Sequence, residues 1–420
     1  MGINEYKQVL LDQQKEKNEI SLETLTARRE EVYFDLSSQL AQIVIGVRRS
    51  GKSTICHKVL KQNNINYAYI NFDDERFYRL KTEDLNTVLE ALYMVYGDFK
   101  YLFCDEVQNI PSWFLFVNRL LRQKVRLIIT GSNAKLLSSE LSTHLTGRYN
   151  QIELFPFSFF EILEYKKIPA DDESTLGVAL RKAAFEEYLS QGGFPELFEV
   201  KNKKAYIRNL FNSIIMRDIK QRFSVRYPEA LRKMADYLTD TICTEINYKS
   251  LAKQFSFGSA HTSENYVGYL RQAYLLIGLQ KFSFKSRERI RSEKNYVIDT
   301  AFISTTKEGF SEQNFGWRLE NIVCIELFRR RNQTLNDVYY YKNNYEVDFV
   351  LVSDNKIVEL IQVSTDISTQ KTFIREVNAL FRAGTELCCN NLTLITLNED
   401  RTYSVDNQTI NIISILKWLS

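Results

Sequence analysis

A glycine-bearing loop between an apolar strand and a helix-forming stretch sets the strongest limit on the fold of this chain. The segment Gly46-Val47-Arg48-Arg49-Ser50-Gly51-Lys52-Ser53-Thr54 matches the pattern GxxxxGK[ST] in full and follows the apolar run Ile43-Val44-Ile45. Glycines let successive backbone N–H groups curl around a phosphate, and the following helix points its positive end at the same group. The predicted phosphate cradle consists of Gly46, Arg48, Arg49, Ser50, Gly51, Lys52, Ser53 and Thr54.

The loop and a second strand predict a site for ATP and Mg²⁺. Lys52 would reach the β- and γ-phosphates, and Ser53 would ligate Mg²⁺. The apolar strand Tyr101–Cys104 ends in Asp105 and Glu106. Asp105 suits a further hold on Mg²⁺, and Glu106 suits polarising the attacking water. A strand whose acidic end only faces solvent is the alternative, which the phosphate loop upstream disfavours.

A third strand end also carries polar side chains. The strand Leu127–Thr130 is followed by Gly131, Ser132 and Asn133. From a neighbouring strand, Ser132 or Asn133 could sense the γ-phosphate. Ser and Asn at a strand end also form ordinary turns, so both interpretations stay open.

Composition describes a globular chain of several domains. Its 420 residues correspond to two to four domains, and 15 Gly and 5 Pro are too few for a low-complexity or disordered chain. No apolar run approaches the ~18 residues of a membrane span, and the first residues are no secretion signal. The six cysteines form no CxxC pair and the three histidines stand apart, which argues against zinc. We expect a cytoplasmic protein with no membrane partner.

The net charge of +3 conceals two basic segments. Residues 201–233 hold ten basic residues against two acidic ones, and residues 281–294 hold six against two. Clustered positive charge can recruit the phosphates of a nucleotide or of DNA. Such charges also form the solvated faces of ordinary helices.

Strands alternate with helices through the first third of the chain, which predicts an α/β fold with a parallel sheet. With the motifs above, the chain resembles the AAA+ ATPases, and more closely the branch often called archaeal-type ATPases, which carries a C-terminal domain of unknown function. The resemblance runs from about Arg28 to the C-terminus. The segments that carry it, besides the loop, are Phe103–Gln108, Thr130–Asn133, Leu145–Arg148, Phe155–Ser158, Gly192–Pro195 and Glu346–Phe349.

This resemblance implies a sensor at Ser132 or Asn133 and an arginine finger. Arg148 is the first candidate, because Arg suits bidentate contact with a phosphate in the transition state. Arg217 is a second candidate, and a surface ion pair is the alternative role for Arg148. A finger supplied to a neighbouring subunit would require a homo-oligomer.

The middle of the chain has the order of a winged helix-turn-helix. Ser250–Phe255 precedes the helix Thr262–Gln272, and the run Leu275–Lys281 follows. The basic stretch Lys281–Lys294 would contain the wing, which could lie along DNA. Such modules also serve as protein–protein adaptors, so DNA and protein partners both stay open.

The tail resembles the core of PD-(D/E)xK restriction-endonuclease folds. Glu320 and Asp348 stand where metal-binding carboxylates are expected. The third strand should supply (D/E)xK but has Gln362 and Ser364, which are a poor Mg²⁺ ligand and an uncharged side chain. Nothing in the sequence requires Lys356 or Lys371 to substitute. We therefore expect a degenerate nuclease fold without cleavage.

The predicted domains are an N-terminal helical segment (1–32), an AAA+ P-loop core (33–155), a helical connector (156–238), a winged-helix-like part (239–292) and an endonuclease-like part (293–420). The leading hypothesis is an ATP-hydrolysing switch coupled to a DNA or protein partner. The alternatives are an ATP-gated DNA nuclease and a DNA-binding scaffold with little turnover.

Overall fold

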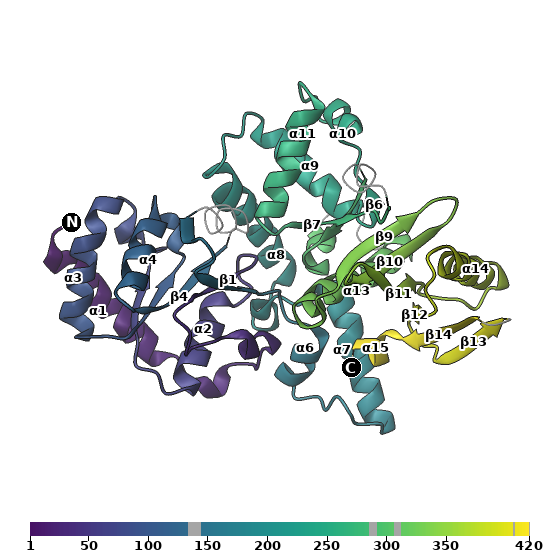
Figure 1. Ribbon diagram of the computed structural model, residues 1–420, viewed down its shortest axis with the longest axis horizontal. Helices are drawn as coiled ribbons and strands as arrows, with labels where there is room; N and C mark the ends of the chain where they lie inside the picture. The colour runs from purple at the N-terminus through teal and green to yellow at the C-terminus, as the bar shows by residue number, and fades with distance from the viewer. Residues whose placement is uncertain (133–143, 285–291, 306–311, 406–407, 420) are drawn as a thin grey trace. The chain divides into compact units, whose positions relative to one another are not determined.

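A computed structural model describes residues 1–132, 144–284, 292–305, 312–405 and 408–419 (Figure 1). The predicted Asn133 lies outside these residues. The chain divides into two compact units, Met1–Pro156 with Gln272–Tyr274, and Phe157–Arg271 with Leu275–Ser420. Within the described residues, no helix is both long and apolar enough to cross a membrane.

The first unit is built on a parallel sheet of five strands in the order β2-β3-β4-β1-β5. The parallel sheet predicted from the sequence is confirmed. Three helices that follow strands are α2 (Lys52–Gln62), α3 (Leu85–Tyr96) and α4 (Trp113–Arg122). The strands are β1 (Ala41–Ile45), β2 (Ala68–Asn71), β3 (Tyr101–Asp105), β4 (Arg126–Gly131) and β5 (Tyr149–Glu153).

The core of this unit lies between the sheet and α2. Apolar side chains of the central strands, among them Val44 and Phe103, pack against Ile55 and Val59 of α2 in one buried cluster. Burial of these side chains stabilises the fold by roughly 1.5–3 kcal/mol each. The packing fixes the helix that starts at the phosphate loop against the strand that ends in Asp105.

The N-terminal helix α1 (Ile3–Glu19) covers the edge strand β2. The Gln13 carboxamide donates to the carbonyl oxygen of Asn71 and accepts from its N–H, at 3.1 and 3.0 Å. The ammonium of Lys17 donates to the carbonyl oxygen of Tyr67 at 3.0 Å. These bonds satisfy backbone groups that an open sheet edge would leave available to another chain.

The second unit begins with helices and continues into a small sheet. Its first helices are α6 (Phe159–Tyr165), α7 (Thr175–Gln191), α8 (Lys203–Ser213), the π-helix η8 (Ile214–Lys220) and α9 (Pro228–Asp240). An antiparallel sheet in the order β6-β8-β7 follows, and two more helices lie between β6 and β7 in the sequence. These elements are β6 (Thr244–Glu245), α10 (Tyr248–Gln254), α11 (Ala260–Gln272), β7 (Leu276–Gln280) and β8 (Glu293–Val297).

The C-terminal part of this unit is a six-stranded mixed sheet in the order β13-β14-β12-β11-β10-β9. Strands β13 and β14 form one side of this sheet. The strands are β9 (Asp337–Lys342), β10 (Glu346–Ser353), β11 (Lys356–Val363), β12 (Leu392–Thr396), β13 (Arg401–Val405) and β14 (Gln408–Ser414). The helices are α13 (Glu312–Thr334), α14 (Gln370–Glu386) and α15 (Ile415–Leu419).

Candidate nucleotide site

The phosphate loop connects β1 to α2, and its backbone conformation requires glycine at particular positions. A Cβ added at Gly46 would lie 2.1 Å from the carbonyl oxygen of Leu154. Gly51 has φ +95° and Arg49 has φ +67°, so the loop turns twice through the left-handed region before α2 begins. Such turns direct several N–H groups toward one point, the geometry that binds an anion.

The side chains of the loop fit a phosphate ligand. Ser50 is fully buried, and its Oγ has no hydrogen-bond partner among the described residues. The Lys52 side chain is buried, and its ammonium donates to the carbonyl oxygen of Val47 at 3.1 Å, so the side chain lies against the loop. Arg48 pairs with Asp73 at 3.4 Å. Arg49 and Thr54 are exposed.

Arg28 supports the loop from outside. Its guanidinium donates to the carbonyl oxygens of Ser50 at 3.0 Å and Phe155 at 2.6 Å, and it is buried. Arg28 therefore ties the phosphate loop to the chain that leaves β5. The sequence identified Arg28 only as the start of the family resemblance, because nothing local indicates a partner 22 residues away.

Asp105 is the buried carboxylate at the end of β3. It accepts hydrogen bonds from Ser53 Oγ at 2.9 Å, from the Tyr69 hydroxyl at 3.3 Å, and from the Thr130 hydroxyl. Burial and the neighbouring Glu106 carboxylate raise the pKa of Asp105 to about 6, while the hydroxyls of Thr130 and Ser53 and the Lys52 ammonium act in the opposite direction. The predicted pair of Mg²⁺ ligands, Ser53 and Asp105, is thus in direct contact.

Glu106 follows Asp105 with a left-handed backbone, φ +52°. One carboxylate oxygen lies 3.9 Å from the Lys52 ammonium. The other accepts a hydrogen bond from the Gln108 carboxamide, whose nitrogen also lies 3.4 Å from Ser132 Oγ. Gln108 therefore links the residue predicted to polarise water with the residue predicted to sense the γ-phosphate.

Two of these residues were missed from the sequence. The Thr130 hydroxyl donates to Asp105 and accepts from the Glu106 N–H at 2.9 Å, so it positions both acids. Thr130 is the next-to-last residue of β4, which precedes Ser132, and Gln108 stands two positions after Glu106. A polar residue at a buried strand end was the available signal for Thr130.

Arg148, the first arginine-finger candidate, lies away from the phosphate loop of its own unit. Arg148 is exposed, directly before β5, and its carbonyl oxygen accepts from the Ala41 N–H at 3.1 Å. Since β5 and β1 are parallel, this is the sheet edge opposite the loop. Arg217 is exposed on η8 in the second unit.

The structure brings two of the nuclease-remnant residues together. Glu320 of α13 and Asp348 of β10 both face the Lys294 ammonium, at 3.3 and 3.7 Å, and Glu346 pairs with it as well. Burial lowers the pKa of Lys294, but the three carboxylates outweigh it, so the pKa is raised well above its ordinary value. The lysine that reaches the remnant is Lys294, whereas Lys356 and Lys371 are exposed.

The expectation that Lys294 belongs to a DNA-facing basic stretch is wrong. Its side chain is only 3% exposed, because β8 turns it toward the acids of the neighbouring elements. Residues 285–291 of that stretch lie outside the described residues.

Of the other two remnant residues, Gln362 also contacts Asp348, whereas the Ser364 hydroxyl bonds to the nearby Asp366. The Gln362 carboxamide accepts from the Asp348 N–H at 3.3 Å and donates to Glu376 at 2.9 Å. Ser364 Oγ donates to the carbonyl oxygen of Asp366 at 3.2 Å. In the described part of the chain, no group of three or more His, Cys, Asp or Glu residues is arranged to hold a metal ion.

Family models match three parts of the chain. Residues 38–163 match an AAA domain, and this range contains the phosphate loop, Asp105, Glu106 and Ser132. Residues 182–313 and 315–418 match two domains of unknown function, DUF8612 and DUF4143. The first unit therefore contains the AAA domain of a P-loop ATPase.

Solved structures give a weaker likeness. The RuvB Holliday junction branch migration motor of Thermotoga maritima is 19% identical, with a TM-score of 0.31 over 57% of this chain and 81% of that one. Cdc6p of Pyrobaculum aerophilum is 16% identical, with a TM-score of 0.25 over 60% of this chain and 82% of that one.

Two curated relatives match most of the chain. An uncharacterized protein of Haemophilus influenzae is 30% identical over 340 residues, which cover 78% of this chain and 82% of the relative. An uncharacterized protein of Methanocaldococcus jannaschii is 34% identical over 394 residues, which cover 90% of this chain and 87% of the relative. The chain carries an AAA domain and belongs to the same family as the Methanocaldococcus jannaschii protein.

Proposed function

We propose that this protein is an Mg²⁺-dependent ATPase that couples the state of its nucleotide to a DNA or protein partner. The observation that carries the proposal is the 2.9 Å hydrogen bond between Ser53 Oγ and Asp105 Oδ1, which joins the phosphate loop to the buried acid of β3. Hydroxyl and carboxylate oxygens suit Mg²⁺. Mg²⁺, when bound with ATP, supplies positive charge to the β- and γ-phosphate oxygens.

Each loop residue has a task that its present contacts support. The N–H groups of the loop and the Lys52 ammonium bind the phosphates, and Lys52 exchanges its bond to Val47 for a phosphate oxygen. Glu106 accepts a hydrogen bond from the attacking water and takes its proton. The Gln108 carboxamide donates to the Glu106 carboxylate and also lies beside Ser132 Oγ. A shift in the position of Ser132 can therefore change the position of Glu106 through the Gln108 side chain.

Completion of the site by a neighbouring subunit is part of the proposal. Arg148 lies at the end of the sheet opposite the loop of its own chain, which supports a role in the site of another copy rather than its own. An arginine supplied in trans stabilises the charge of the transition state. We therefore propose a homo-oligomer with the site at the subunit contact.

A second candidate function is cleavage of DNA by the C-terminal sheet. The approach of Lys294 to Glu320 and Asp348 favours it. Against it, the ammonium lies among the acids that would hold a metal, and Gln362 is bound to Glu376. We therefore propose that this domain does not cut, and that it docks a partner.

Incubation of supercoiled and single-stranded DNA with the protein, Mg²⁺ or Mn²⁺, and ATP tests this point. Uncut DNA is expected. Cleavage that disappears in Asp348→Ala and Lys294→Met would establish the nuclease.

Phosphate release from ATP, measured with and without Mg²⁺ and with and without DNA, tests the main proposal. The ATPase account predicts turnover that requires Mg²⁺ and is lost in Lys52→Ala. Tight ATP binding with no turnover at any protein concentration, with or without DNA, would instead support the scaffold alternative. The solution mass with ATP, recorded on the same samples, reports the oligomer.

A further inference from the structure

The helices after α7 carry a basic surface. Of the ten basic residues between 201 and 233, Lys203 and Arg222 are partly buried and pair with Glu187 and Asp218. The other eight are exposed, against one exposed acid, Glu229. The exposed cations are Lys201, Lys204, Arg208, Arg217, Lys220, Arg226, Arg232 and Lys233.

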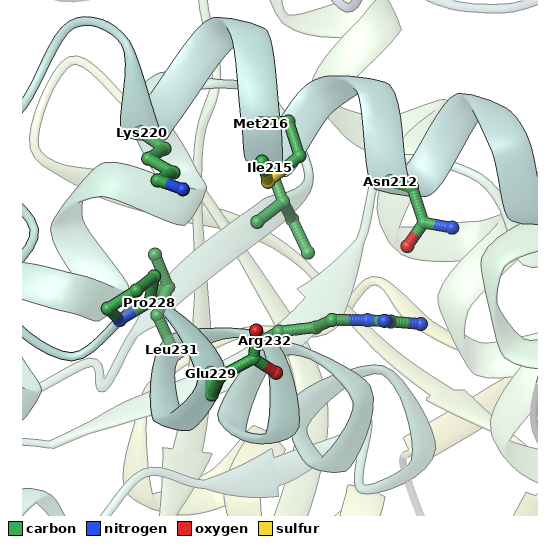
Figure 2. Close-up of a pocket in the computed structure, with 8 residues that line it drawn as sticks. All are labelled: Asn212, Ile215, Met216, Lys220, Pro228, Glu229, Leu231 and Arg232. Atoms are coloured by element: carbon green, nitrogen blue, oxygen red, sulfur yellow. The ribbon is translucent and has the colours of Figure 1, made fainter.

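A small apolar pocket of about 150 Å³ opens in this surface between η8 and α9 (Figure 2). Figure 2 shows Lys220 at one end of the pocket and the guanidinium of Arg232 toward the other, with Ile215 and Met216 between them. Met216 is 49% exposed although its side chain is apolar. A cavity of ~150 Å³ accepts a group the size of benzene, so the pocket fits one Leu, Met or Phe side chain.

A row of cations leads along α8 to the pocket. Lys204, Arg208 and Asn212 are spaced four residues apart, so they share one face of the helix. Asn212 lines the pocket, and Lys204 lies about 12 Å from it along the helix axis at ~1.5 Å per residue. An extended segment of about four residues at ~3.3 Å each would span that distance.

We infer that this surface binds an acidic segment of a partner protein, which inserts one apolar side chain into the pocket. Its carboxylates then face Arg208 and Lys204 on one side and Lys220 and Arg232 at the rim. The inference rests on the proposed coupling to a partner, and it does not require ATP turnover.

The mixture of apolar and charged groups favours a peptide over nucleic acid. A phosphodiester backbone repeats its charge every few ångströms and gains from a continuous cationic track. Here the apolar pocket with the exposed Met216 at its rim interrupts the cations, and a phosphodiester backbone has no apolar side chain to fill it. Exposed Met side chains are typical of surfaces that adapt to the apolar anchors of peptides.

Selection of a phage-displayed library of random peptides on the full-length protein tests the inference. We expect enriched peptides that combine one Leu, Met, Phe or Ile with two or more Asp or Glu. A synthetic, fluorescein-labelled copy of the most enriched peptide is then titrated, with a labelled DNA duplex and single strand titrated in parallel.

Variants at the pocket identify the binding surface. Met216→Lys and Arg232→Glu, both at exposed positions, should each lower the affinity for the peptide about tenfold or more. Lys233→Glu makes the same charge change on the same helix away from the pocket and should cost less than about threefold. ATP binding and thermal stability, measured on the same samples, should be unchanged, so a failure of the ATPase proposal would be seen separately.

Three results would overturn the inference. One is the absence of enriched peptides, and another is an enriched peptide that binds Met216→Lys as tightly as wild type. The third is tight DNA binding that is lost in Arg232→Glu, which would assign the surface to nucleic acid.

Discussion

The hydroxyl of Ser53 donates a hydrogen bond to Oδ1 of Asp105, 52 residues later in the chain, at 2.9 Å. This contact exists because β1 and β3 run parallel on either side of β4 and end at the same sheet edge. It brings together one oxygen from the phosphate loop and one from the acidic strand end. Both oxygens are thereby positioned for one cation.

Ser53→Ala should remove most of the contribution of Mg²⁺ to ATP binding. The variant loses one oxygen ligand but keeps the loop N–H groups and Lys52. We expect ATP affinity in Mg²⁺ to fall about tenfold, or ~1.4 kcal/mol, with little change in EDTA. Calorimetric titrations in both buffers check this, and an equal loss in both would show that Ser53 supports the loop rather than the ion.

Arg148→Ala should reduce ATP turnover by about 10³-fold or more, because the site of the neighbouring subunit loses its arginine finger. The inactive Arg148→Ala and Glu106→Gln proteins, mixed in equal amounts, should regain about a quarter of wild-type activity, because random assembly pairs intact sites with intact fingers. Arg122→Ala, an exposed arginine on α4, is the matched control. Specific activity that stays constant over a hundredfold dilution of a monomer would contradict the account.

Lys294→Met should destabilise the second unit by about 3–5 kcal/mol, because buried carboxylates lose their counterion. Adding Asp348→Asn should restore part of that loss. Lys342→Met is the control, since Lys342 also pairs with Glu346 but is 44% exposed, and it should cost less than about 1 kcal/mol. Urea denaturation measures the free energy of unfolding of the two single variants and the double variant. Equal stability of Lys294→Met and wild type would show that Lys294 and its carboxylate partners do not stabilise the fold.

The buried His57 should lower the free energy of unfolding of the first unit as the pH decreases below neutral. Burial, with Lys61 and Lys17 nearby, lowers its pKa to about 3. Between about pH 3 and its unfolded pKa of ~6.5, only the unfolded chain binds this proton. Stability from His57 therefore falls as pH decreases through that range, by up to ~1.4 kcal/mol per pH unit.

Comparison with His57→Phe isolates this effect. The variant keeps the ring contacts with Tyr69 and Phe103 but cannot titrate. The stability of the wild type relative to His57→Phe should decrease from pH 7 to pH 5. A difference that does not vary with pH would show that folding does not lower the pKa of His57.

The phosphate loop, the acidic strand end and the parallel sheet were predictable because each is encoded by contiguous residues. The loop glycines and the residues at 52, 53, 105 and 106 appear in a local pattern that needs no knowledge of distant contacts.

Residues whose role depends on distant partners were not predictable. Lys294 is 26 residues from Glu320, and in the sequence it ends a run of basic residues typical of a solvated turn. Only the pairing of β8 with β7 and the approach of α13 decide that it is buried. Gln108 likewise has no distinguishing pattern, since its significance comes from the fold that brings Ser132 beside it.

We propose that Glu106 acts in hydrolysis, whereas the phosphate loop acts in binding. The most direct test measures ATP affinity and phosphate release together for Glu106→Gln, a substitution that keeps the shape of the side chain and removes its basicity. The account predicts ATP affinity within about twofold of wild type and turnover reduced by about 10²–10⁴-fold. Turnover equal to wild type in that variant would contradict it.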